Sequence, residues 1–226
     1  MDSTSVQTRE VRIPIESGVL QGDLFLPSGF GAVVAFVNGR GQGRHCLDDR
    51  TVARQLHRAG MASLAIDLLT PEEQQAQARS GKHGVDTPLL TQRVLDVVNW
   101  IGQEPRLKAS ALGLCGVSAG GVVCMIAAAR LGRLVQALVS VGGRPDLAGP
   151  AVLSTVKAPT LLLVGSRDSV NLARHDAAYQ HLRGERSLAV VPGGGPLLEE
   201  PGVLQHAGEM AADWFEFHLA AAEEHA

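Results

Sequence analysis

The sequence has few of the features that mark secreted, membrane or metal-binding proteins. Its 226 residues include only three cysteines, Cys46, Cys115 and Cys124, and these form neither a metal-ligand spacing nor an even disulfide set. We interpret them as small buried hydrophobic side chains in a reducing compartment. No run approaches the roughly 20 apolar residues that a membrane span requires, and residues 1–11 have no apolar signal-peptide core. The expected location is therefore the cytoplasm.

The chain also lacks a cluster of basic residues. It has 20 Lys and Arg against 23 Asp and Glu, and a formal net charge of −3, which argues against nucleic acid as a partner. There is no internal repeat, and 45% hydrophobic residues are enough for a sizeable core. We expect one domain over residues 1–226, with residues 1–10 and 222–226 as flexible ends. A small-molecule substrate or ligand is the expected partner, not a membrane, and a homodimer is left open.

Short apolar runs alternate with amphipathic segments along the whole chain. Residues 11–15 and 19–26 flank Glu16-Ser17-Gly18 and predict a hairpin, and the unbroken apolar run 32–37 is typical of a strand buried on both faces. Further strands are expected at 62–68, 109–115, 135–141, 159–164 and 187–191, with helices at 48–59, 70–79, 87–103, 119–131, 170–182 and 201–221. This alternation predicts an α/β fold. We expect a three-layer α/β/α sandwich around a mostly parallel eight-stranded sheet with an antiparallel N-terminal hairpin.

A nucleophile-elbow motif follows one of these strands. Residues 116–120 read Gly-Val-Ser-Ala-Gly, which fits G-x-S-x-G between a predicted strand and a predicted helix. The flanking glycines allow close backbone approach in a strained turn, so that Ser118 stands clear as a nucleophile. The Ala119 N–H, at a helix amino terminus, is then placed to donate to an oxyanion. The alternative is a glycine-rich turn with an incidental serine.

With this elbow the chain resembles the α/β-hydrolase family, in particular its dienelactone-hydrolase-like branch. The resemblance covers about residues 11–219, and its other segments are 38–41 (Asn-Gly-Arg-Gly), 44–45 (Arg-His), 65–69, 142–147, 165–168 (Gly-Ser-Arg-Asp) and 199–202 (Glu-Glu-Pro-Gly). It implies a catalytic acid at Asp168 and a second oxyanion donor from the backbone of Arg40 or Gly41. The Arg40 side chain could also bind an anionic substrate group. The alternative for Asp168 is a turn or helix-capping aspartate.

The same resemblance shows that the general base is missing. Members of this branch place a histidine between a Pro-Gly pair and the Glu-Glu-Pro-Gly segment, and the register, without a gap, assigns that position to Pro196. Proline has no titratable group and cannot take a proton from Ser118. Three interpretations stay open: a binding protein or an enzyme that needs no triad histidine, a base supplied by another histidine, and a slow hydrolase.

Among the other histidines, His45 is the speculative base because it follows the strand 32–37 near the expected position of Ser118. His83 lies in the excursion before the helix at 87 and could reach over the pocket, whereas His206 falls inside the last helix. Four more histidines are expected on helices and exposed to solvent: His57, His175, His181 and His218.

The sequence leaves several functions open. The glycines of 39–44 partly fit a dinucleotide fingerprint, but Arg44 replaces the third glycine, and the run does not follow the first strand. We therefore expect no cofactor and no metal. Arg144 and Asp146 are interpreted as a loop ion pair, and residues 70–86 as a lid or pocket rim. The preferred function is hydrolysis of a small ester, thioester or lactone through Ser118 with an incomplete triad. A lyase, cyclase or isomerase, or a non-catalytic small-molecule binder, are the alternatives.

Overall fold

The architecture is that of an eight-stranded sheet between two layers of helices. The computed structural model describes residues 7–39, 44, 47–80, 86–196, 198 and 200–220. The strands are β1 (Gln7–Ile15), β2 (Gly18–Leu26), β3 (Ala32–Asn38), β4 (Ala62–Asp67), β5 (Ala111–Val117), β6 (Ala137–Val141), β7 (Thr160–Gly165) and β8 (Arg186–Val191). The helices are α1 (Leu47–Arg58), α2 (Pro71–Ser80), α3 (Thr87–Gln103), α4 (Gly120–Leu131), α5 (Gly149–Leu153), α6 (Ser169–His181) and α7 (Val203–Ala220). Two short 3-10 helices, Gly132–Leu134 and Pro145–Ala148, complete the described elements.

The strand order is β1-β2-β4-β3-β5-β6-β7-β8. The β1–β2 hairpin is antiparallel, β2 pairs antiparallel with β4, and every pair from β4 through β8 is parallel. The carboxyl ends of β3 to β8 therefore meet at one edge of the sheet, which is where ligands bind in open α/β folds. The predicted fold class and the predicted hairpin are confirmed.

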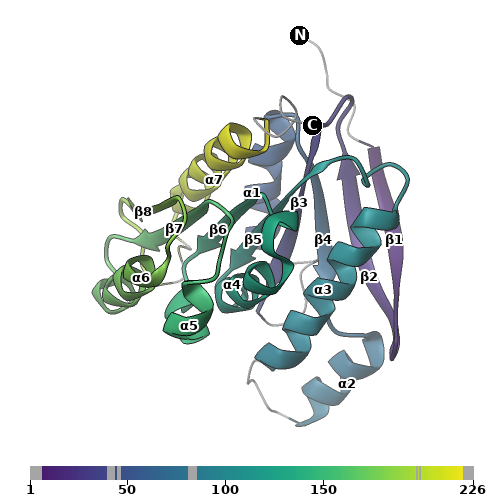
Figure 1. The fold of residues 1–226 in the computed structure, drawn as a ribbon, viewed down its shortest axis with the longest axis horizontal. Helices are drawn as coiled ribbons and strands as arrows, with labels where there is room; N and C mark the ends of the chain where they lie inside the picture. Colours follow the sequence, from purple (N-terminus) through teal and green to yellow (C-terminus); the bar gives the residue numbers. More distant parts are fainter. Residues whose placement is uncertain are drawn as a thin grey trace.

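The two faces of the sheet have separate cores. Helices α3, α4 and α6 pack on one face, and α1 and α7 pack against each other on the opposite face. Figure 1 shows α3 and α4 in front of the sheet. All residues of β3, β4, β5, β6 and β7 are buried, because a strand covered by helices on both faces exposes neither set of side chains. Cys115 and Cys124 are buried, as expected, and Cys46 lies outside the described residues.

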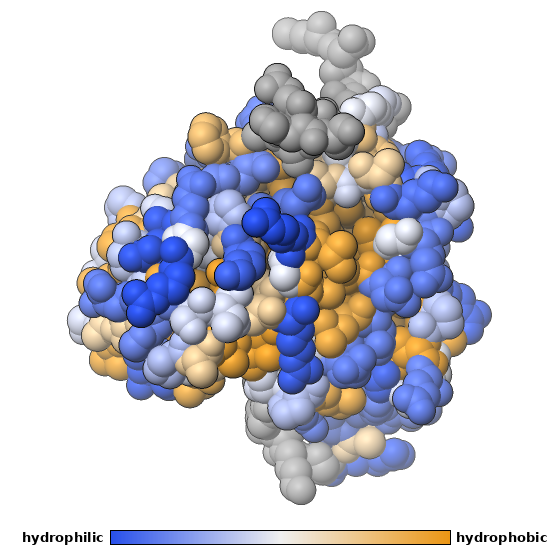
Figure 2. Space-filling model, in the orientation of Figure 1, coloured by the Kyte–Doolittle hydropathy of each residue, from blue (hydrophilic) through white to orange (hydrophobic). Residues whose placement is uncertain are grey.

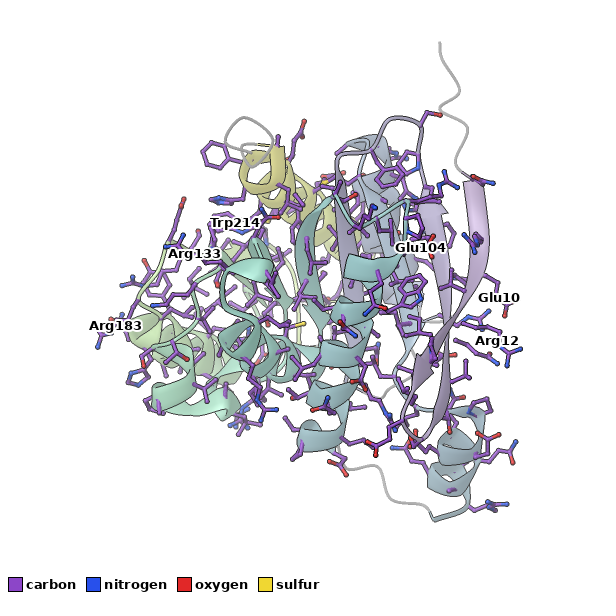
Figure 3. All side chains as sticks on the ribbon, turned by 45° about the vertical axis from the view of Figure 1, so that its right-hand side comes forward. Glu10, Arg12, Glu104, Arg133, Arg183 and Trp214 are labelled. Carbon is purple, nitrogen blue, oxygen red and sulfur yellow. The ribbon has the colours of Figure 1, made fainter. Side chains whose placement is uncertain are left out.

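The β1 edge is protected by charge. Val11 and Ile13 point into the core, whereas Glu10 and Arg12 are exposed and point away from the sheet (Figure 3). Charged residues on an edge strand oppose pairing with another chain. The alternation follows from the period of two in a strand that is covered on one face only.

The helix boundaries differ from the prediction at a few ends. Asp86, not Thr87, caps α3: its carboxylate accepts the Leu89 N–H at 3.0 Å, which leaves Thr87 and Pro88 inside the first turn. Aspartate is the better cap because its carboxylate also interacts with the positive end of the helix dipole. The sequence pattern did not predict α5 (Gly149–Leu153), a short helix between β6 and β7.

The helical layer in front of the sheet is not entirely polar on its outer side. Figure 2 shows an apolar area in the middle of this face, with polar residues around it. The partly buried apolar residues of α3 and α4 include Leu95, Trp100 and Ile126.

Among the described helices, none is both long and apolar enough to cross a membrane.

Candidate active site

Ser118 lies in a strained turn at the carboxyl end of β5. It joins β5 to α4, is exposed, and has a φ of +54°. A residue other than glycine rarely adopts this left-handed conformation, and it persists only where the surroundings impose it. Here the Ser118 N–H donates to the Val141 carbonyl at 2.8 Å, and its carbonyl accepts the Gly121 N–H at 3.1 Å. The fold therefore presents the hydroxyl at the edge of the sheet where a ligand would bind.

Two glycines make this turn sterically possible. A Cβ on Gly120 would overlap the carbonyl oxygen of Val37, in β3. A Cβ on Gly143, after β6, would overlap the carbonyl oxygen of Ser118 itself, and Gly143 also has a φ of +77°. The second glycine of the motif and Gly143 outside it thus allow the elbow to pack closely against backbone on both sides of β5.

Ala119 lies at the amino terminus of α4, as expected for an oxyanion donor. It is the N-cap residue of α4, with φ −65° and ψ −8°, so its N–H belongs to the group of helix-terminal donors that bind anions. Gly39 packs directly against Ala119, which brings the end of β3 to the elbow. Arg40 and Gly41, the predicted source of the second donor, lie outside the described residues, as does His45.

Asp168 follows β7 and caps α6. Its side chain is buried, and its two oxygens accept hydrogen bonds from the backbone N–H and the side-chain amide of Asn171, at 3.1 and 2.6 Å. The capping alternative for this residue is therefore present in the structure. The acid role remains a prediction, since capping does not exclude it.

The structure brings Pro196 to the same edge of the sheet. Its carbonyl oxygen lies 3.8 Å from the position of a Cβ on Gly142, the neighbour of Gly143, which touches Ser118. The preceding residues of this loop bind the loop after β7: the Gly194 carbonyl accepts the Arg167 N–H at 2.8 Å, and the Gly193 N–H donates to Ser166 Oγ at 2.9 Å. Pro196 therefore lies near the loop after β6 that packs against Ser118, and its assignment to the histidine position stays a prediction.

An ion pair joins the loop that contains Pro196 to the loop after β7 that leads to Asp168. Arg167 Nη2 lies 2.7 Å from Glu200 Oε1. The hydrogen bond from the Gly195 backbone to the Glu200 carboxylate, together with its own backbone N–H and Arg167, keeps the pKa of Glu200 below its usual range. Glu200 is therefore an anion at neutral pH. It binds Gly195 of its own loop and Arg167 of the loop after β7.

The expectation that the helical histidines are solvated is wrong for His175. This side chain lies on α6 and is fully buried, with Nδ1 2.8 Å from the Asn171 carbonyl oxygen. Burial lowers the pKa of His175, against the opposing effect of the Asn171 and Gly142 carbonyls and of Asp146 and Asp168. The residue is therefore neutral at pH 7, and Nδ1 is the donor, because a carbonyl oxygen only accepts.

Three other histidines are also less exposed than expected. His57 is half-buried, with Nε2 2.7 Å from Ser63 Oγ, and the His218 side chain is 7% exposed and packs against the Trp214 ring. Burial lowers the pKa of both imidazoles. His181 is half-buried on α6, whereas His206 lies on α7, in the last helix as predicted, and is exposed. His83 lies outside the described residues.

Two predicted loop features have clear structural roles. Arg144 and Asp146 form the expected ion pair, with two hydrogen bonds of 2.8 and 2.7 Å, and the hydrogen bond from Arg144 lowers the pKa of Asp146. In the segment predicted as a lid or rim, α2 lies at the lower right of Figure 1. Buried Arg93 holds it, donating to Glu73 of α2 at 3.0 Å and to Ser17 of the hairpin turn at 2.7 Å.

Sequence reasoning missed the residues that hold this edge together. Arg44 donates to Gln21, Asp23 and Glu10 on the hairpin at 2.8, 2.9 and 3.0 Å, but hydropathy gives no signal for such a contact between distant segments. Asn171, in contrast, stands three residues after Asp168, a spacing that is typical of a side-chain contact in a first helical turn.

Among the described residues, no group of three or more His, Cys, Asp or Glu side chains could hold a metal ion.

Known proteins with the same architecture include hydrolases of several kinds. The family model described as BAAT / acyl-CoA thioester hydrolase C terminal matches residues 95–158, which include the elbow. Over 132 residues the chain is 28% identical to a peroxisomal succinyl-coenzyme A thioesterase of Mus musculus, covering 58% of this chain and 29% of the relative. A Mycobacterium tuberculosis protein named as a phosphoribosyl transferase is 40% identical over 214 residues, which are 95% of this chain and 47% of the relative. The chain thus spans about half the length, or less, of these curated relatives.

A full-length structural relative shows the family. The crystal structure of a dienelactone hydrolase from Anabaena variabilis is 38% identical, with a TM-score of 0.91, over 95% of this chain and 99% of that protein. Est1E from Butyrivibrio proteoclasticus has a TM-score of 0.75 at 14% identity and shows the fold alone. The chain therefore belongs to the α/β-hydrolase family, in its dienelactone-hydrolase-like branch.

Proposed function

We propose that this protein hydrolyses a small carboxylic ester, thioester or lactone, with Ser118 as the nucleophile and an atypical triad. The observation on which the proposal rests is the conformation of Ser118: exposed, at φ +54°, and enclosed by backbone from β3 and from the loop after β6. A strained residue with no chemical role would be costly to keep, because glycine at this position would remove the strain. The hydrolases among its relatives support the same function.

In this proposal, Ser118 Oγ gives up its proton to a base and attacks the substrate carbonyl carbon; the tetrahedral oxyanion then breaks its bond to the alcohol, thiol or enol leaving group, which departs and leaves an acyl-enzyme. The Ala119 N–H and a backbone donor from Arg40 or Gly41 would stabilise the oxyanion. A water molecule would then hydrolyse the acyl-enzyme. Pro196 supplies neither the base for the attack nor the acid for the leaving group, and His45 remains the candidate that could supply them.

The missing histidine favours substrates with a good leaving group. In a complete triad the imidazolium protonates the leaving group as it departs. A thiolate, whose conjugate acid has a pKa of about 8.5 in cysteine, or the enolate of an enol lactone needs this proton less than the alkoxide of an ordinary alcohol. A thioester or an enol lactone is therefore the preferred substrate class. The thioesterase relatives agree with the first of these.

Phosphoribosyl transfer is not favoured for this chain. The Mycobacterium tuberculosis relative with that name shares 47% of its length with this chain, so the name can describe its remaining part. A strained serine at the carboxyl end of a central strand has a direct use in acyl transfer.

The test combines labelling and turnover. Wild type, Ser118→Ala and Ser28→Ala are treated with a serine-directed fluorophosphonate and assayed with an activated short-chain ester and an acyl thioester. Ser28 is an exposed serine between β2 and β3, away from the carboxyl ends of the parallel strands, and is the matched control. We expect labelling and turnover in wild type and Ser28→Ala and neither in Ser118→Ala. If wild type shows neither, hydrolysis is wrong and a non-hydrolytic enzyme or a small-molecule binder replaces it.

A further inference from the structure

The hydrogen bonds at Asp168 differ from those of an acid that orients a histidine. Asp168 Oδ1 accepts the Asn171 N–H, and Oδ2 accepts the Asn171 side-chain amide at 2.6 Å. The second bond is shorter than most hydrogen bonds from an amide nitrogen to an oxygen. The oxygen that is not used for capping is therefore occupied by an amide from the same helix.

The Asn171 side chain is itself held in place from its other end. Its Oδ1 accepts Arg174 Nη1 at 2.9 Å, and its backbone carbonyl accepts His175 Nδ1 at 2.8 Å. A guanidinium only donates and a carboxylate only accepts, so the residue between them must offer one acceptor and one donor. Asparagine meets this requirement in one orientation of its amide. Aspartate would repel Asp168, and an apolar residue would remove the side-chain partner of Asp168 Oδ2 and of Arg174 Nη1.

The surroundings of Asn171 also include the loop after β6. The positive charge of Arg174 helps to lower the pKa of Asp146, which Arg144 binds through two hydrogen bonds. Arg144 follows Gly143, the residue that packs against the Ser118 carbonyl. Asp168 is thus bound to the first turn of α6, and the Pro196 carbonyl faces the loop after β6 at Gly142.

We propose that Asn171 is a positioning residue that takes the place of the triad histidine as the partner of Asp168. With Asn171 bound to its carboxylate and a proline at position 196, Asp168 caps α6 and does not orient a base for Ser118. The two positions then form one coupled replacement. A histidine restored at position 196 would compete with the Asn171 amide for Asp168, and removal of that amide would allow the contact.

The experiment compares Pro196→His, the double variant Pro196→His/Asn171→Ala, and Asn171→Ala alone. The control double variant is Pro196→His/Asn99→Ala, because Asn99 is an exposed asparagine on α3. The first readout is the NMR titration of the introduced imidazole, which requires no activity. We expect its pKa to be raised in the double variant, by contact with the Asp168 carboxylate, and to stay near the ordinary value in the other two variants that contain it.

The second readout is kcat/KM against pH with an activated ester, and it alone rests on the proposed function. We expect at least a tenfold gain for Pro196→His/Asn171→Ala over Pro196→His, with an acidic limb at the pKa found by NMR. Equal imidazole pKa values in the single and double variants would overturn the inference, whatever the activity. A raised pKa without turnover in any variant would instead count against the proposed function and leave the role of Asn171 intact.

Folding is checked by thermal unfolding of each variant. Should Asn171→Ala fail to fold, Asn171→Ser replaces it, because serine keeps a small polar side chain in the first turn of α6 and removes the amide. The same difference in imidazole pKa is then expected, and its absence overturns the inference in the same way.

Discussion

The two halves of the candidate site are built by different means. On the Ser118 side, the geometry comes from backbone: a residue at φ +54° and two glycines whose missing Cβ atoms let β3 and the loop after β6 approach. On the Asp168 side, side chains add to the backbone bonds of the loops: Asn171 binds the carboxylate, and Arg167 pairs with Glu200. Backbone geometry like that of the elbow cannot be changed without moving the sheet, whereas side-chain partners can be exchanged singly. A substitution at position 196 or 171 can therefore leave the elbow intact.

The comparison predicts that the largest loss of stability comes from the elbow backbone. Gly120→Ala places a Cβ on the Val37 carbonyl oxygen, and such overpacking costs about 3 kcal/mol or more when backbone must move. Gly102→Ala is the control: it lies exposed near the end of α3 with open space around its Cβ position, and alanine should stabilise it by about 0.5–1 kcal/mol. Urea unfolding measures both. If Gly120→Ala and Gly102→Ala change the free energy of unfolding by the same amount and in the same direction, the packing at Gly120 is not as tight as described.

On the other side, we expect Asp168 to matter first as a helix cap. Asp168→Ala removes both acceptors of the Asn171 N–H and amide and should lower the free energy of unfolding by about 1–2 kcal/mol. Asp168→Asn keeps an acceptor for the backbone N–H and should cost less. If both variants unfold like the wild type, the capping role is wrong.

The strain at Ser118 should oppose stability directly. Ser118→Gly relieves the left-handed conformation and should raise the free energy of unfolding by about 1 kcal/mol, while Ser118→Ala, which keeps a Cβ, should not. Both variants lose the hydroxyl and hence the proposed activity. The denaturant midpoints of Ser118→Gly and Ser118→Ala are compared, provided that their unfolding curves have the same slope. If Ser118→Gly is no more stable than Ser118→Ala, the turn is not strained.

The smallest expected effect is a pH dependence from buried imidazoles. The pKa values of His175, His57 and His218 are lowered by burial in the folded state, so the unfolded chain binds protons at a higher pH than the folded chain. Stability is therefore full above about pH 6.5 and falls as pH decreases below that value, until the folded-state pKa values are passed. Unfolding temperatures between pH 7.5 and 5 measure the slope. His175→Gln should flatten it, whereas His206→Gln, at an exposed position, should leave it unchanged.

Much of the fold was predictable because its signals are local. Unbroken apolar runs such as residues 32–37 identify strands covered on both faces, and the glycines around Ser118 mark the elbow. Helix ends were less accurate, as at Asp86, because several neighbouring residues could cap the same turn. The solvent exposure of His175 was predicted wrongly, since a helix position alone does not say which face packs on the sheet.

The sequence by itself determined the fold class and the elbow turn, because both depend on short-range periodicity or on a motif of a few residues, and the assignment of Pro196 to the histidine position stays a prediction. Only the tertiary structure decided which atoms donate hydrogen bonds to the Asp168 carboxylate. It also decided that His175 is buried and neutral, and that Gly143 packs against the Ser118 carbonyl. Burial and the contact at Gly143 arise between segments far apart in the chain. Their energies depend on distance and desolvation, which no local pattern of residues encodes.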